Sequence, residues 1–411
     1  MKEYLRNDAE IIALRAIEAV KPDAAVCRAL ENVNLTGKIY LVAAGKAAWQ
    51  MAAAAVQYLK APICKGIVVT KYDHVMGEIP GVICYEAGHP VPDENSFRGT
   101  QAVLDMTENL TQEDTVLFLL SGGGSALFEK PLVEGEVLQD ITKKLLARGA
   151  DITEINTIRK RLSMVKGGRF AAHCAPARVE AIILSDILGD PVDMIASGPA
   201  AADSATSEDA KRIAAKYGVD DREEVRVCLE QETPKEVPNV HTQIIGSVRE
   251  LCRAAEKAAR ELGYDCIFLS DHLDGEASDT GRWMADQLRK YAGCGKKVAL
   301  LAGGETVVHL KGNGLGGRNQ ELALAAAEVL DEIPNAALIS VGSDGTDGPT
   351  DAAGGYADSD TVQEMNAKGM DIRAYLDNND AYHALRAVDN LIITGPTGTN
   401  VNDVTVGLIW G

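Results

Sequence analysis

The sequence predicts an α/β fold with two domains and a cleft between them. Short apolar runs alternate with helical patterns along nearly the whole chain of 411 residues, which is typical of βα units and parallel sheets. The length favours two or three domains over one. The composition shifts at residues 223–240, an acidic stretch with two prolines, and we interpret its later part as a linker. We therefore expect one domain at residues 1–236 and a second at residues 237–411.

The apolar runs and the helical periodicity place the elements of both domains. In the first domain we expect strands at 39–44, 67–70, 82–86, 115–120 and 179–184, and helices at 47–59, 96–109 and 135–148. In the second domain we expect strands at 242–246, 266–269, 298–302, 306–310, 336–341, 391–393 and 404–409, and helices at 248–262, 277–291 and 318–331.

The composition excludes several classes of function. The formal net charge is −19 at pH 7 and no stripe of lysine and arginine is present, so we expect no nucleic acid partner. The eight cysteines contain no CxxC pair, which argues against a cysteine metal site and a disulfide framework. The charged N-terminus is unlike a signal peptide, and no run of 18 apolar residues predicts a membrane span. We therefore expect a cytoplasmic protein with no membrane partner.

Four glycine-rich segments carry the functional signal, because each follows an apolar run that predicts a strand. They are residues 121–125, 312–319, 344–351 and 394–403. Glycines at strand ends let backbone N–H groups approach an anion closely. The last three segments also contain Arg, Asp, Asn or Thr, the residue types that bind phosphate groups or a hard cation. The pattern indicates a small anionic substrate together with a nucleotide and a metal ion.

Two segments of the first domain suit an anion. Lys46 lies between a predicted strand and a predicted helix, where its charge would join the helix N-terminal amides; a solvated lysine at a strand end is an equal alternative. The run Ser121-Gly122-Gly123-Gly124-Ser125 favours close backbone approach to a phosphate over a merely flexible loop. Neither the GxxxxGK[ST] motif nor the GxSxG motif occurs in the chain.

Two further segments leave alternatives open. The glycines at 312, 314 and 317 match the dinucleotide motif GxGxxG, but an arginine at 318 suits a phosphoryl group or a carboxylate better than a dinucleotide. The basic residues of segment 156–168 either line an anion site or form a solvated helix face; they are Arg159, Lys160, Arg161 and Lys166.

Aspartates in two loops are candidates for a catalytic base or for metal ligands. Asp186 and Asp190 follow a predicted parallel strand, where ligand-contacting residues gather, although turn-forming aspartates are a sufficient alternative. Asp344, Asp347 and Asp351 share one loop at a spacing that fails the EF-hand pattern. Mg²⁺ held by one or two carboxylates and substrate phosphates fits this loop, as does a tight loop ordered by its own side chains.

Taken together, the motifs resemble those of the glycerate kinases that carry a C-terminal MOFRL domain, a family also named hydroxypyruvate reductases in the past. The resemblance covers almost the whole chain, in the family's order, at residues 45–48, 121–127, 185–191, 316–321, 344–354 and 394–403. It implies a larger N-terminal Rossmann-like domain, a smaller C-terminal α/β domain, and an active site between them.

The resemblance also implies the reaction, an in-line phosphorylation of D-glycerate by ATP with Mg²⁺, at the 2-hydroxyl. The family's active-site lysine falls on Lys46 and its arginine on Arg318. We choose Asp190 as the group that orients or deprotonates the hydroxyl, and Asp344 and Asp347 as metal ligands. For the nucleotide and its phosphates we expect Ser121, Gly122, Gly123, Gly124, Ser125, Gly316, Gly317, Asn319, Thr397 and Asn400. The alternatives are an NAD(P)-dependent hydroxypyruvate reductase that uses residues 312–317 and a non-catalytic anion sensor. The oligomeric state, monomer or homodimer, stays open.

Overall fold

The computed structural model describes residues 2–31, 33, 35–59, 62–185 and 191–411, and the chain forms two compact units. The larger unit comprises residues 22–245, and the smaller unit comprises residues 1–21 together with 246–411. Each unit contains a six-stranded sheet. The boundary between units therefore lies nine residues beyond the expected 236, and the first helix joins the C-terminal part of the chain. None of the described helices combines the length and apolarity that crossing a membrane requires.

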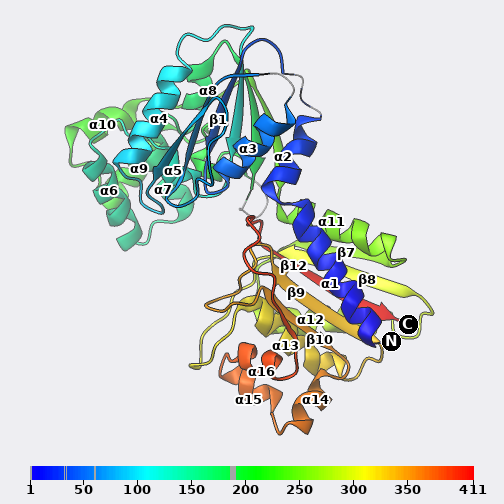
Figure 1. Cartoon of the computed structure of the whole chain (residues 1–411). Coiled ribbons are helices and arrows are strands. Elements are labelled where there is room, and N and C mark those ends of the chain that lie inside the picture. The colour runs from blue at the N-terminus through cyan, green and yellow to red at the C-terminus, as the bar shows by residue number, and fades with distance from the viewer. Residues whose placement is uncertain (1, 32, 34, 60–61, 186–190) are drawn as a thin grey trace. The chain divides into compact units, whose positions relative to one another are not determined.

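The sheet of the larger unit has the order β3-β2-β1-β4-β5-β6. Figure 1 shows this sheet, with β1 labelled, and the helices beside it. Its strands are β1 (Ile39–Ala44), β2 (Ile63–Lys71), β3 (Val82–Ala87), β4 (Thr115–Leu120), β5 (Arg178–Leu184) and β6 (Val240–Gly246). The strands from β3 across to β5 pair in parallel. The helices are α2 (Pro22–Leu30), α3 (Ala48–Tyr58), α4 (Glu94–Met106), α5 (Gly124–Leu127), α6 (Gly135–Ala147), α7 (Ile152–Arg161), α8 (Arg169–Cys174), α9 (Ser207–Tyr217) and α10 (Glu223–Glu230).

This strand order fixes where a ligand can reach the larger unit. All six residues of β4 are buried, as expected for a parallel strand that is covered on both faces. The connections leave β1 toward one side of the sheet and β4 toward the other, so the chain reverses its direction of winding between these two strands. The loops after β1 and β4 diverge at such a point, and the gap at the carboxyl ends of the strands is where open α/β sheets bind ligands.

One predicted strand lies in the other unit. The strand expected at 242–246 was assigned to the second domain, but β6 forms an edge of the larger unit's sheet beside β5. The acidic stretch before it begins with helix α10 and returns to this sheet, where the N–H of Val179 donates to the carbonyl of Asn239 at 2.8 Å. Apolar periodicity identifies a strand but carries no information about its partner, which explains the misplaced boundary.

The sheet of the smaller unit has the order β11-β10-β9-β12-β8-β7 and is mixed rather than parallel. Its strands are β7 (Asp265–Leu273), β8 (Lys297–Gly304), β9 (Ala336–Gly342), β10 (Gly354–Asp358), β11 (Leu391–Ile392) and β12 (Asp403–Trp410). The last strand, β12, inserts antiparallel between β8 and β9, so the expectation of a parallel sheet is wrong here. The helices are α1 (Lys2–Ala19), α11 (Val248–Glu261), α12 (Ala277–Arg289), α13 (Arg318–Leu330), α14 (Thr361–Ala367), α15 (Ile372–Asp377) and α16 (Ala381–Ala387).

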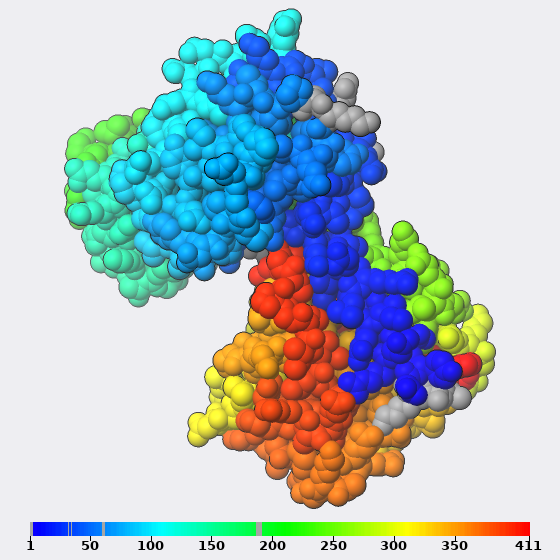
Figure 2. Space-filling view, in the orientation of Figure 1, coloured from blue at the N-terminus to red at the C-terminus, as the bar shows by residue number. Residues whose placement is uncertain are grey.

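Helix α1 belongs to the smaller unit because its side chains bond to that unit. It packs on β9, β12 and α11, and Figure 2 shows its blue surface beside the red surface of the C-terminal segment. The hydroxyl of Tyr264 donates to Asp8 at 2.8 Å, and Arg6 donates to the carbonyl of Asp389 at 2.6 Å. On the opposite face, α12 and α13 pack on alternate residues of β8, namely Val298, Leu300 and Ala302.

The segment at 306–310 is not a strand, contrary to the sequence prediction. Only Val307 makes a bridge, to Glu276, and Leu310 is 80% exposed. The alternating apolar residues therefore belong to a loop that runs from β8 to α13. This loop contains the GxGxxG glycines.

Candidate active site

The loops after β1 and β4 of the larger unit interlock at the point where the winding reverses. The N–H of Lys46 donates to the carbonyl of Gly122 at 2.9 Å, and the N–H of Ala47 donates to Ser121 Oγ at 3.1 Å. Gly45 has a φ of +123°, and a Cβ atom there would lie 2.2 Å from Ser121 Oγ. Glycine is therefore required at position 45, and its close approach fixes the backbone of Lys46 against the glycine loop.

Basic side chains gather around Gly123 in this loop. A Cβ atom placed on Gly123 would lie 3.1 Å from the Cγ atom of Lys46 and 3.0 Å from Cδ2 of His89. His74 Nδ1 lies 3.1 Å from the carbonyl oxygen of Lys46, and the charge of Lys71 acts on His89. We name Lys46, Lys71, His74 and His89 the basic cluster. Among the residues that the structure describes, none of the four side chains forms a salt bridge, although the protein is strongly acidic.

The two serines of the glycine loop have protein partners. Ser121 is buried and accepts from Ala47, while Ser125 Oγ lies 3.0 Å from Ser197 Oγ, which donates to Asn156 at 2.9 Å. In contrast, the N–H groups of Gly122 and Gly123 have no hydrogen-bond partner in the described part of the chain. The backbone of this loop, more than its hydroxyls, is therefore free to bind an anion.

Two buried cations lie beneath the same loop. Lys166 and Arg159 donate to the carbonyl of Ser125 at 2.9 and 2.8 Å, and Lys166 also pairs with Glu129 at 3.2 Å. Burial lowers the pKa of Lys166 to about 8, although Glu129 favours its charged form. Lys160 and Arg161 are also buried, so the basic run is not a solvated helix face.

The aspartates chosen from the loop after β5, Asp186 and Asp190, lie outside the described residues. The assignment of Asp190 to the substrate hydroxyl therefore stays a prediction.

In the smaller unit, Arg318 is held by two carboxylates. Its Nε and Nη2 atoms donate to the two oxygens of Asp403 at 2.5 and 2.9 Å, and its Nη1 atom lies 3.2 Å from Glu305. Asp403 begins β12, where it pairs with Gly304 and Gly342 at the ends of the neighbouring strands. Burial raises the pKa of Asp403 to about 6, while Arg318 counters that rise. Burial would lower the pKa of Arg318, but Asp403 and Glu305 raise it on balance.

Asp347 caps helix α13 rather than projecting into open space. One carboxylate oxygen accepts from the N–H and side-chain amide of Asn319 at 3.2 and 3.3 Å, and the other accepts from the N–H and side-chain amide of Gln320 at 2.9 and 3.0 Å. A Cβ atom at Gly317 would lie 2.4 Å from the backbone of Asp347, so Gly317 is required for this approach. The carboxylate thus occupies the helix N-terminus that we expected to receive a phosphate.

The remaining predicted residues of the smaller unit form one loop structure around Asp344. Asp344 Oδ1 accepts from the N–H and hydroxyl of Thr346 at 2.9 and 3.1 Å, and its carbonyl accepts from the N–H of Thr397 at 3.2 Å. Asn400 Oδ1 accepts from the N–H of Asn402 at 3.4 Å. Within the described residues, no three His, Cys, Asp or Glu side chains are grouped so that they could hold a metal ion. Gly316 packs against Gly348 across this region.

The GxGxxG segment does not form a dinucleotide site. Its N–H groups are consumed by the turn between α15 and α16: Gly312 donates to Asn379 at 3.1 Å, Gly314 to Asn378 at 2.9 Å, and Leu315 to Asp380 at 2.9 Å. A Cβ atom at Gly312 or Gly314 would lie within 2.4 Å of Asn378 or Asp380. The glycines at 312 and 314 therefore serve close packing within the unit, and the amides of residues 312–315 are bonded to the protein instead of being available for a pyrophosphate.

Sequence reasoning missed several residues of these two sites. Lys71 is the last residue of β2 and His89 follows β3, so the rule that ligand-contacting residues gather at the carboxyl ends of parallel strands points to both. Asp403 lies at the end of a motif that was recognised, but its pairing with Arg318 depends on β12 inserting beside β8. No sequence pattern signals that insertion.

The fold and the sites define an α/β protein whose glycine loop presents free backbone amides beside a lysine. The family model described as a domain of unknown function (DUF4147) matches residues 8–230, and the MOFRL family matches residues 298–403. D-glycerate 2-kinase of Thermotoga maritima is 52% identical over 99% of both chains. A putative hydroxypyruvate reductase of Agrobacterium vitis is 39% identical over 96% of this chain and 92% of its own. The crystal structure of the glycerate kinase from Thermotoga maritima superposes with a TM-score of 0.95 at 52% identity, covering 99% of this chain and 100% of the Thermotoga chain.

The chain belongs to the glycerate kinase family with a MOFRL domain.

Proposed function

We propose that this protein transfers the γ-phosphoryl group of ATP to the 2-hydroxyl of D-glycerate. The observation that carries the proposal is Lys46, which forms no salt bridge with any described residue and is fixed against a glycine loop with free amides. The chain also matches a D-glycerate 2-kinase over 99% of its length. Phosphoryl transfer asks an enzyme mainly for positioning and for stabilisation of charge. Lysine and free backbone amides supply both to a phosphate or a carboxylate.

The proposed roles of the residues that the structure describes follow from their contacts. Lys46 and the amides of Gly122 and Gly123 bind the anionic groups of the substrates, and the buried Lys166 and Arg159 hold the loop in place. Arg318 stabilises charge in the transition state, and Asp403 orients its guanidinium. The hydroxyl oxygen attacks the γ-phosphorus, the bond to the β-phosphate bridging oxygen breaks, and the hydroxyl proton passes to a base, for which we propose Asp190.

Mg²⁺ is proposed as a companion of the nucleotide rather than as an ion in a protein cage. Asp347 uses both oxygens to cap α13, and Asp403 uses both for Arg318, so Asp344 is the candidate that fits best. Mg²⁺ requires few protein ligands when substrate phosphates supply the others. When bound, the ion would neutralise the phosphate charge.

A coupled assay for ADP formation with D-glycerate, ATP and Mg²⁺ tests the function, and NADH oxidation with hydroxypyruvate tests the reductase alternative. We expect ADP formation with a kcat/KM that Lys46→Ala lowers about a hundredfold. Lys38 is an exposed lysine just before the amino end of β1, and Lys38→Ala should leave ADP formation intact. Phosphorus NMR of the product distinguishes 2-phosphoglycerate from 3-phosphoglycerate. NADH oxidation without ADP formation would refute the kinase proposal.

A further inference from the structure

His89 lies at the glycine loop, at the edge of the sheet where the loops after β1, β3 and β4 gather. It follows β3 by two residues and is half-buried. A Cβ atom on Gly123 would lie 3.1 Å from His89 Nε2, so this nitrogen faces the glycine loop. The stem of Lys46 lies at the same distance from that Cβ position. The imidazole of His89, the side chain of Lys46 and the backbone of Gly123 therefore lie next to one another.

The loop that carries His89 is anchored firmly on its far side. Asp93 accepts from the N–H of Ser96 at 3.0 Å, which caps helix α4, and from the hydroxyl of Tyr72 at 2.7 Å. Gly88 also donates to Asp93 from its backbone. A side chain on a loop that is bonded at this many points is pre-organised, which is a property expected of a ligand-contacting group.

The ring nitrogens of His89 have no partner of their own. No hydrogen bond or salt bridge in the described part of the chain uses either nitrogen, whereas His74, His173 and His241 each contact an oxygen. Burial, followed by the charges of Lys46, Lys71 and His74, lowers the pKa of His89. The imidazole is thus neutral at neutral pH, retains one N–H donor, and lies within a group of cations that attracts anions.

We propose that His89 Nε2 donates a hydrogen bond to an anionic oxygen of the bound substrates, either a carboxylate oxygen of glycerate or a phosphoryl oxygen of ATP. This inference rests on the proposed kinase function for the identity of the anion. A hydrogen bond to a charged group typically accounts for about a tenfold to hundredfold change in affinity.

Three substitutions separate this contact from other roles. In His89→Gln the amide nitrogen lies close to the position of Nε2, whereas in His89→Asn it lies close to that of Nδ1, and His89→Ala removes both. We expect His89→Ala and His89→Asn to raise one KM by about tenfold to hundredfold, with kcat changed less, and His89→Gln to recover most of the loss. A raised KM for D-glycerate identifies the carboxylate, and a raised KM for ATP identifies the phosphoryl group. His241→Gln, on the exposed side chain that contacts Glu180, is the matched control.

Calorimetry provides a readout that does not depend on catalysis. Titration of the whole protein with inorganic phosphate, and separately with D-glycerate and ADP, should show weaker binding of at least one of these ligands to His89→Ala than to the wild type. If the wild type forms no ADP from glycerate, the kinase proposal fails while weaker phosphate binding by His89→Ala still supports the contact. Equal binding and equal KM values would overturn it. A collapse of kcat at constant KM that His89→Gln does not rescue would overturn it as well.

Discussion

Replacing Asp347 with alanine should destabilise the smaller unit and leave the Mg²⁺ requirement unchanged. The Asp347 carboxylate accepts four hydrogen bonds from Asn319 and Gln320, two of them from backbone N–H groups of the first turn of α13. Loss of a helix N-cap costs about 0.5–2 kcal/mol, and each buried donor left without a partner costs about 1–3 kcal/mol. Burial raises the pKa of Asp347, which shows that burying its charged form costs free energy. Alanine removes this cost, and that gain offsets part of the loss.

The net expectation is a loss of about 2–4 kcal/mol in the free energy of unfolding of the smaller unit. At roughly 2–4 °C per kcal/mol for a unit of this size, the melting temperature should fall by roughly 5–15 °C. Differential scanning calorimetry measures the fall, and Mg²⁺ titration of ADP formation at low temperature measures the metal requirement of the folded fraction.

Asp344→Asn is the matched comparison. Among the described residues its Oδ1 atom accepts hydrogen bonds from Thr346 alone, and an asparagine oxygen can retain those bonds, so stability should change little. If Asp344 reaches Mg²⁺, the Mg²⁺ requirement should rise in this variant alone. A raised Mg²⁺ requirement in Asp347→Ala with a melting temperature within about 1 °C of the wild type would refute the capping argument and restore Asp347 as a metal ligand.

Four further outcomes are expected. Lys46→Ala and Arg318→Ala should each lower kcat/KM about a hundredfold, because a lost transition-state charge contact costs on the order of 3 kcal/mol. Steady-state kinetics measures the loss, and circular dichroism checks that both variants fold. Arg373→Ala, at an exposed arginine, is the control. The folded-state pKa of Asp403 is about 6, above its ordinary value of 3.8. Activity should therefore fall below pH 6, because Asp403 takes up a proton and releases Arg318. Asp403→Asn should lack this fall in activity at acidic pH. The raised pKa also makes the contribution of Asp403 to the free energy of unfolding largest below about pH 4, and this contribution is lost as the pH rises through 6. Thermal melts of the wild type and Asp403→Asn across this pH range measure the difference. Gly314→Ala should lower the melting temperature, since its Cβ would lie 2.4 Å from Asp380, and it should leave NADH binding absent as in the wild type.

The elements of the larger unit could be predicted because parallel strands buried on both faces leave continuous apolar runs. The predicted strands 39–44 and 115–120 are confirmed to the residue as β1 and β4. The glycine segments mark the ends of such strands, so the pattern alone predicts Lys46 and the run 121–125 as candidate anion-binding residues. The same rule points to His89, but the loop after β3 contains no glycine run that would attract attention.

The smaller unit was harder to predict because its sheet is closed by the last strand of the chain. Inserting β12 between β8 and β9 brings Asp403 to Arg318 across 85 positions of sequence, and no local periodicity encodes that insertion. The same limit applies to the GxGxxG motif, whose three glycines match the dinucleotide pattern. The match failed because the amides of residues 312–315 bond to the turn at 378–380, a partner some 65 positions away.

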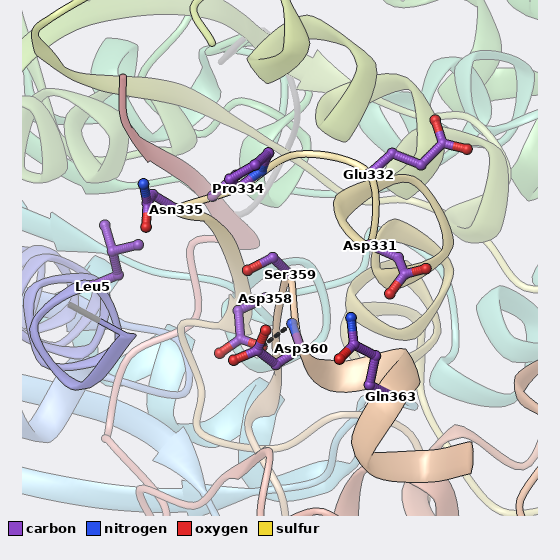
Figure 3. A pocket seen from close by; sticks show the side chains of 10 residues that line it. Leu5, Asp331, Glu332, Pro334, Asn335, Asp358, Ser359, Asp360 and Gln363 are labelled. Carbon is purple, nitrogen blue, oxygen red and sulfur yellow. Dashed lines mark hydrogen bonds between the residues drawn. The ribbon is translucent and has the colours of Figure 1, made fainter. Parts of the chain in front are cut away.

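A pocket at the far end of the smaller sheet shows why a hollow alone does not identify a site. It lies where β9 begins and β10 ends, and Asp331, Glu332, Asp358 and Asp360 line it (Figure 3). Asp403 lies at the other end of β9, about 20 Å along the strand. Asp358 accepts hydrogen bonds from the N–H of Asp360 and the hydroxyl of Thr361, so its carboxylate serves the local turn. Acidic side chains of this kind repel the anions that the reaction requires.

The basic cluster and Arg318 differ in how far their positive charges are neutralised by carboxylates of the protein. This difference indicates different roles in binding and catalysis. Arg318 is paired with Asp403 and Glu305, so an anion that approaches it must compete with carboxylates. Lys46 and Lys71 have no salt bridge among the described residues, and the loop beside them retains two free amides. An anion therefore gains more from the basic cluster than from Arg318 in the ground state. We infer that the larger unit provides most of the substrate affinity, while Arg318 acts on charge that develops during transfer, so Lys46→Ala should raise KM more than Arg318→Ala does.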